Sequence, residues 1–268
     1  MKKRKNWLLW SGVAFLITLV AFAVFWPMLG HRFDDPVGRP FEPPFGNFLF
    51  GTDELGRDIL SRLAYGARYS LGIGIAVQLI SLVVGIVVAV IGTFAPGWVR
   101  MPLLRFTDGM FAFPDILLAL LIIGVWRPGW LPVIVALSIT AWPATTRLVV
   151  TQMASLKDRE FVVAARAQGA STAYVVIKHI LPQLVGILMA VTMVNLAGTI
   201  LAESTLSFLG VGVQPPDPSW GSMINQAREK INSNPVLLIW PCSILIVTIY
   251  ALNFVGDGLR ELLDPKRK

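Results

Sequence analysis

Long uncharged stretches alternate with short clusters of charged and turn-forming residues along the whole 268-residue chain. A helix needs about 20 mostly apolar residues to cross roughly 30 Å of hydrocarbon. Six stretches reach that length, and they lie within residues 7–29, 69–99, 104–126, 131–150, 183–202 and 231–256. Charged residues fall in or near the third and fourth of them, namely Arg105, Asp108, Asp115 and Arg147. The pattern predicts an all-α integral membrane protein with six transmembrane helices.

Composition supports a membrane protein and excludes several other classes. Hydrophobic residues make up 55% of the chain and charged residues 15%, with a mean hydropathy of +0.67. Soluble domains average about 45–50% apolar and about 25% charged residues. The single cysteine, Cys242, excludes a disulfide scaffold, and we expect it to be a small buried apolar residue of the last span.

Orientation follows from the distribution of Lys and Arg, which are enriched in cytoplasmic loops. With both termini in the cytoplasm, 15 of the 23 basic residues fall on the cytoplasmic side. They lie within residues 2–5, 100–105, 147–178 and 260–268. The net charge of +7 therefore reflects membrane topology, and it does not indicate a face that binds nucleic acid.

The first apolar stretch has a second interpretation. The basic residues 2–5, the apolar run and Ala21-Phe22-Ala23 resemble a signal peptide with its cleavage site. Cleavage would leave five spans, which cannot keep the basic loop 147–178 and the C-terminal tail on one side. The uncharged run also continues to Leu29, so we expect an uncleaved transmembrane helix.

The outer loop, residues 30–68, carries a second pattern of apolar positions. Thr52 is a suitable helix N-cap, and two acidic residues follow it. Apolar side chains then recur on one helical face, at Leu55, Ile59 and Leu63. Asp58 and Arg62 are spaced as a favourable i,i+4 pair. The pattern predicts a short amphipathic helix over 52–67 that lies on the outer surface, with packing and anchoring as its main role.

The cytoplasmic segment 158–181 predicts two short helices. Asp158 is placed to cap a helix over 159–168 that Gly169 ends, and a second helix runs from Ser171 or Thr172 to Leu181. Small residues line one face of the pair, at Ala164, Ala165, Ala167 and Ala170. Another protein could approach the backbone closely there, although composition alone equally fits a solvated loop of good helix formers.

Several short motifs occur in order along residues 50–265. Ala164-Ala165-x3-Gly169 is followed by His179-Ile180-Leu181-Pro182. The others are Gly51-Thr52-Asp53-x2-Gly56-Arg57-Asp58, Ala112-Phe113-Pro114, Leu206-Ser207-Phe208-Leu209-Gly210, Gln214-Pro215-Pro216, Trp220-Gly221 and Gly256-Asp257-Gly258-Leu259-Arg260 through Leu263-Asp264-Pro265. Together they resemble the ABC-importer permeases of the oligopeptide/dipeptide/nickel family, of the second-permease-subunit type. The family's leading Glu is replaced here by Val163.

The resemblance implies the type I ABC importer permease fold in a bacterial or archaeal plasma (inner) membrane. It implies a homologous permease subunit as heterodimer partner, two ATP-binding ATPase subunits and an extracytoplasmic solute-binding protein. Residues 1–68 would form the N-terminal helix and outer loop, and residues 69–268 the permease core with its coupling loop. The residues expected to couple this chain to the ATPase are Glu160, Phe161, Ala164, Ala165, Arg166, Gly169 and Ala170.

The sequence offers no catalytic chemistry of its own. It contains no Gly-x4-Gly-Lys-Ser/Thr loop, so the chain is not itself an ATPase or another enzyme, and no cofactor or metal site is expected. The two histidines, His31 and His179, fall on opposite sides of the membrane in the predicted topology.

Polar residues inside the spans are the candidates for a solute pathway: Asp115, Asn195 and Glu203, with Gln78 a further one. Helix-packing hydrogen bonds would also explain Gln78 and Asn195, and interfacial solvation would explain Glu203. An alternative function is a proton-coupled secondary transporter, with Asp115 and Glu203 as the coupling acids and with broken helices and an internal repeat. No repeat is visible, and a scaffold without a pathway leaves these polar residues unexplained. The sequence leaves the solute open among dipeptides, oligopeptides, nickel chelates and glutathione, and the neutral spans favour peptides over a bare metal ion.

Overall fold

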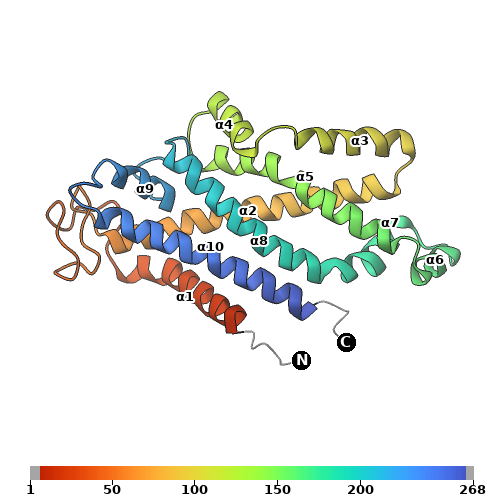
Figure 1. Ribbon diagram of the computed structural model, residues 1–268, viewed down its shortest axis with the longest axis horizontal. Coiled ribbons are helices and arrows are strands. Elements are labelled where there is room, and N and C mark those ends of the chain that lie inside the picture. Colours follow the sequence, from red (N-terminus) through yellow and green to blue (C-terminus); the bar gives the residue numbers. More distant parts are fainter. Residues whose placement is uncertain (1–6, 264–268) are drawn as a thin grey trace.

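The computed structural model describes residues 7–263 as an elongated bundle of helices (Figure 1). The basic residues 2–5 and 266–268, and the motif residues Asp264 and Pro265, lie outside the described residues. The helices are α1 (Trp7–Leu29), α2 (Ile59–Phe94), α3 (Gly97–Met110), α4 (Asp115–Val125), α5 (Trp130–Leu156), α6 (Glu160–Ala167), α7 (Thr172–Val175), the π-helical turn η1 (Val176–Ile180), α8 (Leu181–Phe208), α9 (Trp220–Arg228) and α10 (Val236–Leu263).

The described residues contain five helices that are long and apolar enough to cross a membrane. These are α1, α2, α5, α10 and the continuous helix Thr172–Phe208, which joins α7, η1 and α8. The pair α3 and α4 passes the same test together but is bent by 92°, as a broken span or a re-entrant loop is. The predicted all-α membrane fold is therefore confirmed with five continuous spans, and this bent pair stands at the place of the predicted third span.

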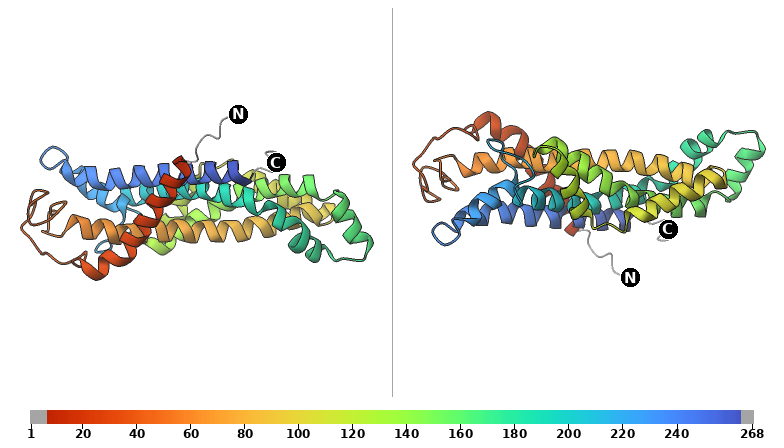
Figure 2. Two further views of the ribbon diagram at one scale, coloured as in Figure 1. Left: turned by 90° about the horizontal axis from the view of Figure 1, so that it is seen from below. Right: turned by 90° about the horizontal axis from the view of Figure 1, so that it is seen from above.

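α2 lies at the centre of the bundle and packs against α5 on one side and α8 on the other. α10 packs along α8, and α1 covers α10 and α2, crossing the bundle obliquely (Figure 2). α1 approaches α10 closely because Gly12 has no side chain. A β-carbon added there would lie only 2.8 Å from the carbonyl oxygen of Ala251. The boundary expected near residue 68 falls inside α2, so the outer loop leads directly into the central helix.

The amphipathic helix predicted over 52–67 is wrong. Residues 52–58 form a tight turn that is closed by an isolated bridge between Thr52 and Asp58, and α2 begins only at Ile59. Asp58 is the N-cap, because its carboxylate accepts the backbone N–H groups of Leu60 and Ser61. Ile59 and Leu63 are buried as the first turns of a spanning helix, and Leu55 is exposed.

The third span breaks at residues 111–114. Pro114 has no N–H to donate and disfavours a helical conformation at the residue before it, so α3 ends at Met110. The chain resumes a helix at Asp115, the first residue of α4. The break lies about halfway along the molecule, between the labels α3 and α4 in Figure 1.

The segment 158–181, which we expect to be cytoplasmic, differs from the expected pair of short helices in two respects. The side chain of Asp158 caps nothing, and α6 starts after Arg159 without a side-chain cap. Ser171 does cap α7, but the helix then continues through Pro182 into α8. The π-helical turn Val176–Ile180 ends just before Pro182, and its hydrogen bonds run from i to i+5 instead of i+4. The helix therefore accommodates the missing N–H of Pro182 and stays continuous. Gly169 ends the α6 region with φ +85°, as predicted.

The outer end holds a buried polar joint between α2, α8 and α9, which we call the outer joint. Trp220, the first residue of α9, is fully buried and donates from Nε1 to the carbonyl of Leu63 at 3.3 Å. Its backbone N–H donates to Ser70 Oγ at 3.3 Å. The sequence pattern did not predict α9. Cys242, expected to be buried, is only half-buried.

Candidate functional site

A cavity of about 300 Å³ lies beside the break of the third span. Residues from α2, α5, α8 and the start of α4 line it. Its polar residues are Gln78, Asp115, Thr140, Asn195 and Thr199. Several lining residues, including Phe111 and Val194, are exposed at the surface of the chain, so the cavity is open on one side of the bundle.

Two helices supply a chain of hydrogen bonds along one wall of this cavity. Gln78 of α2 is buried and donates from Nε2 to Thr199 Oγ1 at 2.6 Å. The Thr199 hydroxyl donates to the backbone carbonyl of Asn195 at 3.0 Å. Gln78 therefore makes the interhelical hydrogen bond considered from sequence, and it also faces the cavity. Thr140 and Thr199 were not singled out from sequence, although the i,i+4 spacing of Asn195 and Thr199 places both on one helical face.

Asp115 stands at the first residue of α4 and lines the same cavity. It is exposed in the single chain, and no hydrogen bond or ion pair joins its carboxylate to another described residue. A charged group at this depth requires water, a solute or a polar partner, because hydrocarbon does not solvate it.

Glu203 lies elsewhere. Its side chain has 0% exposure, which overturns interfacial solvation, and it does not line the cavity. Its carboxylate accepts hydrogen bonds from the hydroxyls of Ser70 at 3.0 Å, Ser207 at 2.7 Å and Ser204 at 3.3 Å. Ser70 links this cluster to the Trp220 backbone, so Glu203 belongs to the outer joint.

Two of the charged residues that interrupt the third and fourth spans, Asp108 and Arg147, pair with each other. Arg147 of α5 donates to Asp108 of α3 at 2.6 Å. Its guanidinium also lies over the ring of Phe111, 4.6 Å from the centroid. Phe111 is a lining residue of the cavity, so this pair flanks the break without placing a charge inside it.

A second hollow, of about 670 Å³, lies at the end of the bundle that carries α6. Its lining residues are Phe161, Ala164, Ala165, Gln168, Gly169, Ala170, Ser171, Tyr174 and His179. Five of the expected coupling residues are among them, and Glu160 and Arg166 are not. Arg166 lies over the ring of Phe94 instead, at 5.2 Å. The π-helical turn brings His179 within 5.7 Å of the Tyr174 ring centroid, a contact without a local sequence signal.

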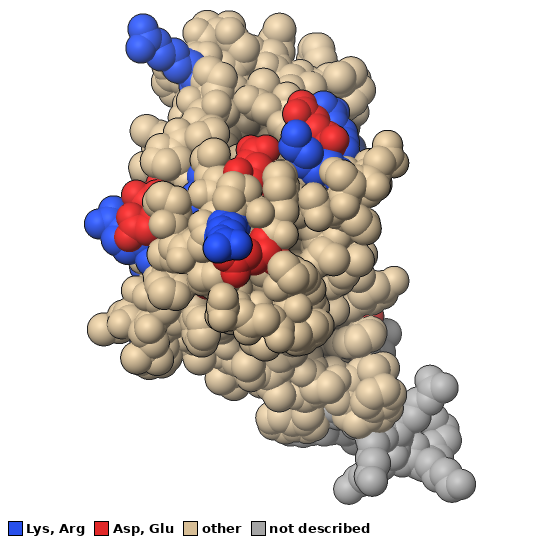
Figure 3. All heavy atoms as spheres, turned by 90° about the vertical axis from the view of Figure 1, so that its left-hand side faces the viewer, with Lys and Arg blue, Asp and Glu red and all other residues tan. Residues whose placement is uncertain are grey.

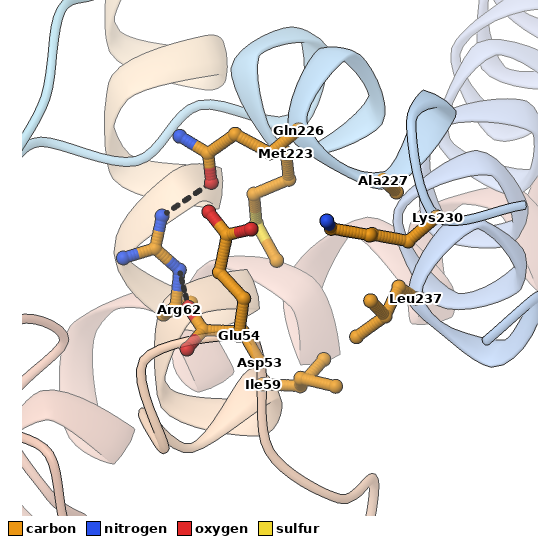
Figure 4. Close-up of a pocket in the computed structure, with 9 residues that line it drawn as sticks. All are labelled: Asp53, Glu54, Ile59, Arg62, Met223, Gln226, Ala227, Lys230 and Leu237. Carbon is orange, nitrogen blue, oxygen red and sulfur yellow. Dashed lines mark hydrogen bonds and ion pairs between the residues drawn. The ribbon is translucent and has the colours of Figure 1, made fainter. Parts of the chain in front are cut away.

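The opposite end of the bundle is rich in paired charges. Figure 3 looks onto it and shows Lys and Arg beside Asp and Glu in small mixed clusters. Arg62, with 2% exposure, contacts Asp53 at 3.4 Å and Gln226 at 3.2 Å (Figure 4). The expected Asp58–Arg62 pair does not form, because Asp58 caps α2. Glu54 lies between Arg62 and Lys230 in the same small pocket (Figure 4).

Another charge pair of the outer loop is solvent-exposed. The Arg32 guanidinium donates to Asp34 at 3.2 Å and lowers the pKa of the Asp34 carboxyl below its ordinary value. An exposed pair of this kind contributes little to stability.

A bundle of spans with a polar cavity beside a broken helix pair fits the class of membrane transport proteins. Residues 81–268 match the family described as "Binding-protein-dependent transport system inner membrane component". The chain belongs to this family.

Curated relatives match almost the whole chain. The dipeptide transport system permease protein DppC of Alkalihalophilus pseudofirmus is 34% identical over 99% of this chain and 88% of that protein. The di/tripeptide transport system permease protein DppC of Pseudomonas aeruginosa is 36% identical over 96% of this chain and 88% of that protein. The glutathione transport system permease protein GsiD of Pectobacterium atrosepticum is 36% identical over 95% of this chain and 85% of that protein.

A solved structure shares the fold. It is an inward-facing conformation of the MetNI methionine ABC transporter, with a TM-score of 0.63 and 20% identity, covering 77% of this chain and 96% of that one.

The chain is thus a multi-pass permease subunit of an ABC importer, and ATP hydrolysis occurs on separate ATPase subunits. The broken third span also fits the alternative of a secondary transporter, which the family does not favour.

Proposed function

We propose that this chain is the second-type permease subunit of a peptide importer and forms one half of the translocation pathway. The observation that carries the proposal is the identity of 34–36%, over 95–99% of the chain, to permeases named for dipeptides, di/tripeptides, oligopeptides and glutathione. All of these solutes are short peptides by chemistry. A homologous permease would supply the other half, in a complex with two ATPase subunits and an extracytoplasmic solute-binding protein.

The cavity beside the break of the third span, which we call the central cavity, is the proposed contribution of this chain to the pathway. Asp115 and Asn195 line it, amid helices that are otherwise apolar. Polar groups at this depth are costly unless they face water or a solute, so their clustering supports a pathway. The exposed side would be closed by the partner permease. Glu203, fully buried in the outer joint, is better assigned to holding α2, α8 and α9 together.

The hollow beside α6 is the proposed docking surface for the ATPase. α6 exposes Ala164 at the rim, and its small side chain lets another backbone approach. Of the expected coupling residues, Phe161, Ala164, Ala165, Gly169 and Ala170 would contact the partner directly. Glu160 and Arg166 flank this surface on the same helix.

The proposed topology has both termini in the cytoplasm, with α6 on the cytoplasmic side and the 30–58 loop outside. A fluorescent-protein fusion after Lys268 should be fluorescent, and alkaline phosphatase inserted within 126–130 should be active, because each reporter works on one side only. The reason is that this topology places 15 of the 23 basic residues of the sequence on the cytoplasmic side. An active phosphatase fused after Lys268 would contradict this topology.

ATP-dependent uptake of a peptide tests the proposed function. The four membrane and ATPase subunits would be reconstituted in vesicles, with the binding protein outside and ATP inside. We expect labelled Ala-Ala to accumulate only when ATP and the binding protein are both present. Accumulation without ATP, driven by a proton gradient, would contradict the proposal in favour of a secondary transporter.

A further inference from the structure

The central cavity contains a single formal charge. Among its lining residues, Asp115 alone carries a charged side chain, and no described residue pairs with it. Arg147, which flanks the break, pairs with Asp108 at 2.6 Å and lies over the ring of Phe111. Residues 7–263 therefore leave one negative charge uncompensated at the cavity.

The remaining polar groups of the cavity mostly offer acceptors. The hydroxyl protons of Thr140 and Thr199 are donated to backbone carbonyls of Leu137 and Asn195. Gln78 donates from Nε2 to the Thr199 hydroxyl, and no hydrogen bond joins its Oε1 to another described residue. The Asn195 amide adds two donors and one acceptor. A ligand that fits this set brings hydrogen-bond donors and a positive charge.

We infer that the cavity receives the cationic end of the transported solute, with Asp115 as its counter-charge; this rests on the proposed function. A primary ammonium group, such as the amino terminus of a peptide, supplies three donors and one positive charge. The cavity volume, about 300 Å³, is at the lower end of the range of ligand pockets, so it suits one end of a peptide. Asp115 is then a specificity-determining residue for solutes with a free amino group.

A purely structural role for Asp115 makes a different prediction. An acidic residue in the first turn also stabilises a helix by its position at the positive end of the dipole. Asparagine keeps the size and the hydrogen-bonding oxygen of this residue but removes the charge. Glutamate keeps the charge on a longer stem. The two variants therefore separate the counter-charge from the local geometry of α4.

The test uses the complete transporter in vesicles, with labelled Ala-Ala as the probe. We expect Asp115→Asn to lower ATP-dependent uptake at least about tenfold, since a hydrogen bond to a charged group is stronger than one between neutral groups. Asp115→Glu should keep at least about a third of wild-type uptake, because the charge is retained. Co-purification of the four membrane and ATPase subunits should be unchanged in both variants, which shows that the complex still assembles.

Asp35→Asn is the matched control, because it neutralises an exposed carboxylate of the outer loop far from the cavity. It should leave uptake unchanged. Normal uptake by Asp115→Asn, or a loss confined to Asp115→Glu, would overturn the inference while the proposed function stands. A wild-type complex that takes up no Ala-Ala would overturn the proposed function, and the inference with it.

Discussion

Replacing Ala164 with arginine is expected to abolish uptake while the chain still folds and inserts. Ala164 is exposed on α6 and lines the hollow that we propose as the ATPase docking surface. A short helix that docks in a partner's groove needs close contact, and a long charged side chain would hold the two surfaces apart. Ala165 is less suitable for this test, because it packs against the buried cluster beneath α6. We expect uptake to fall to background and the ATPase to be lost on purification in detergent.

Gly169→Val tests the same surface through the backbone. Gly169 has φ +85°, a left-handed conformation that a β-branched residue adopts at a cost of about 1–2 kcal/mol. No atom lies within 4 Å of a β-carbon placed there, so the effect would come from the chain direction after α6 and not from a clash. We expect this variant to weaken ATPase association as well.

Ala173→Arg is the matched control for both variants. Ala173 is exposed on α7, two residues after the hollow's Ser171, and does not line the hollow. The same chemical change there should leave ATPase co-purification and uptake near wild type. Normal uptake by Ala164→Arg would show that this surface does not couple the permease to the ATPase.

The spans were predictable because about 20 consecutive apolar residues are typical of a transmembrane helix. The structure of the outer loop was not predictable, because its residues satisfy two different local patterns. Thr52 and Asp58 are both good N-caps, and the apolar residues Ile59 and Leu63 fit a helix that starts after either of them. Tertiary contacts decide between them: Asp53 binds Arg57 at 2.6 Å and Arg62 at 3.4 Å, which holds residues 52–58 as a turn.

The sequence predicts that polar residues inside the spans line a cavity, but it does not predict which of them do. Asp115, Asn195 and Glu203 are each an isolated polar residue within an apolar stretch of the sequence. The break at Pro114 places Asp115 at the cavity lined by α5 and α8. Glu203 lies about two turns beyond Asn195 along α8, where α9 covers it. The position of α9 depends on the loop before it and on the burial of Trp220. Neither leaves a periodic pattern of apolar residues in the sequence.

The outer joint has so little free space that one added methyl group is expected to destabilise the chain. A β-carbon on Gly221 would overlap the carbonyl oxygen of Ser204 and lie 2.6 Å from its Cα. Both atoms belong to the backbone of α8, so a side-chain rotation cannot relieve the overlap. Overpacking costs about 1–3 kcal/mol where side chains move, and we expect at least about 3 kcal/mol for Gly221→Ala.

The measurement is thermal unfolding of the purified protein in detergent. Since 1 kcal/mol shifts the midpoint by about 2–4 °C in a chain of this size, Gly221→Ala should lower it by about 6 °C or more. Gly72→Ala is the matched control, because no atom lies within 4 Å of a β-carbon on Gly72 in the middle of α2. Alanine favours a helix over glycine by about 0.8–1 kcal/mol, so this control should unfold at the wild-type temperature or slightly above it. Equal midpoints for both variants would mean that α9 does not pack on α8 as closely as the Gly221–Ser204 contact requires, and Glu203 would then lack the cover that keeps it buried.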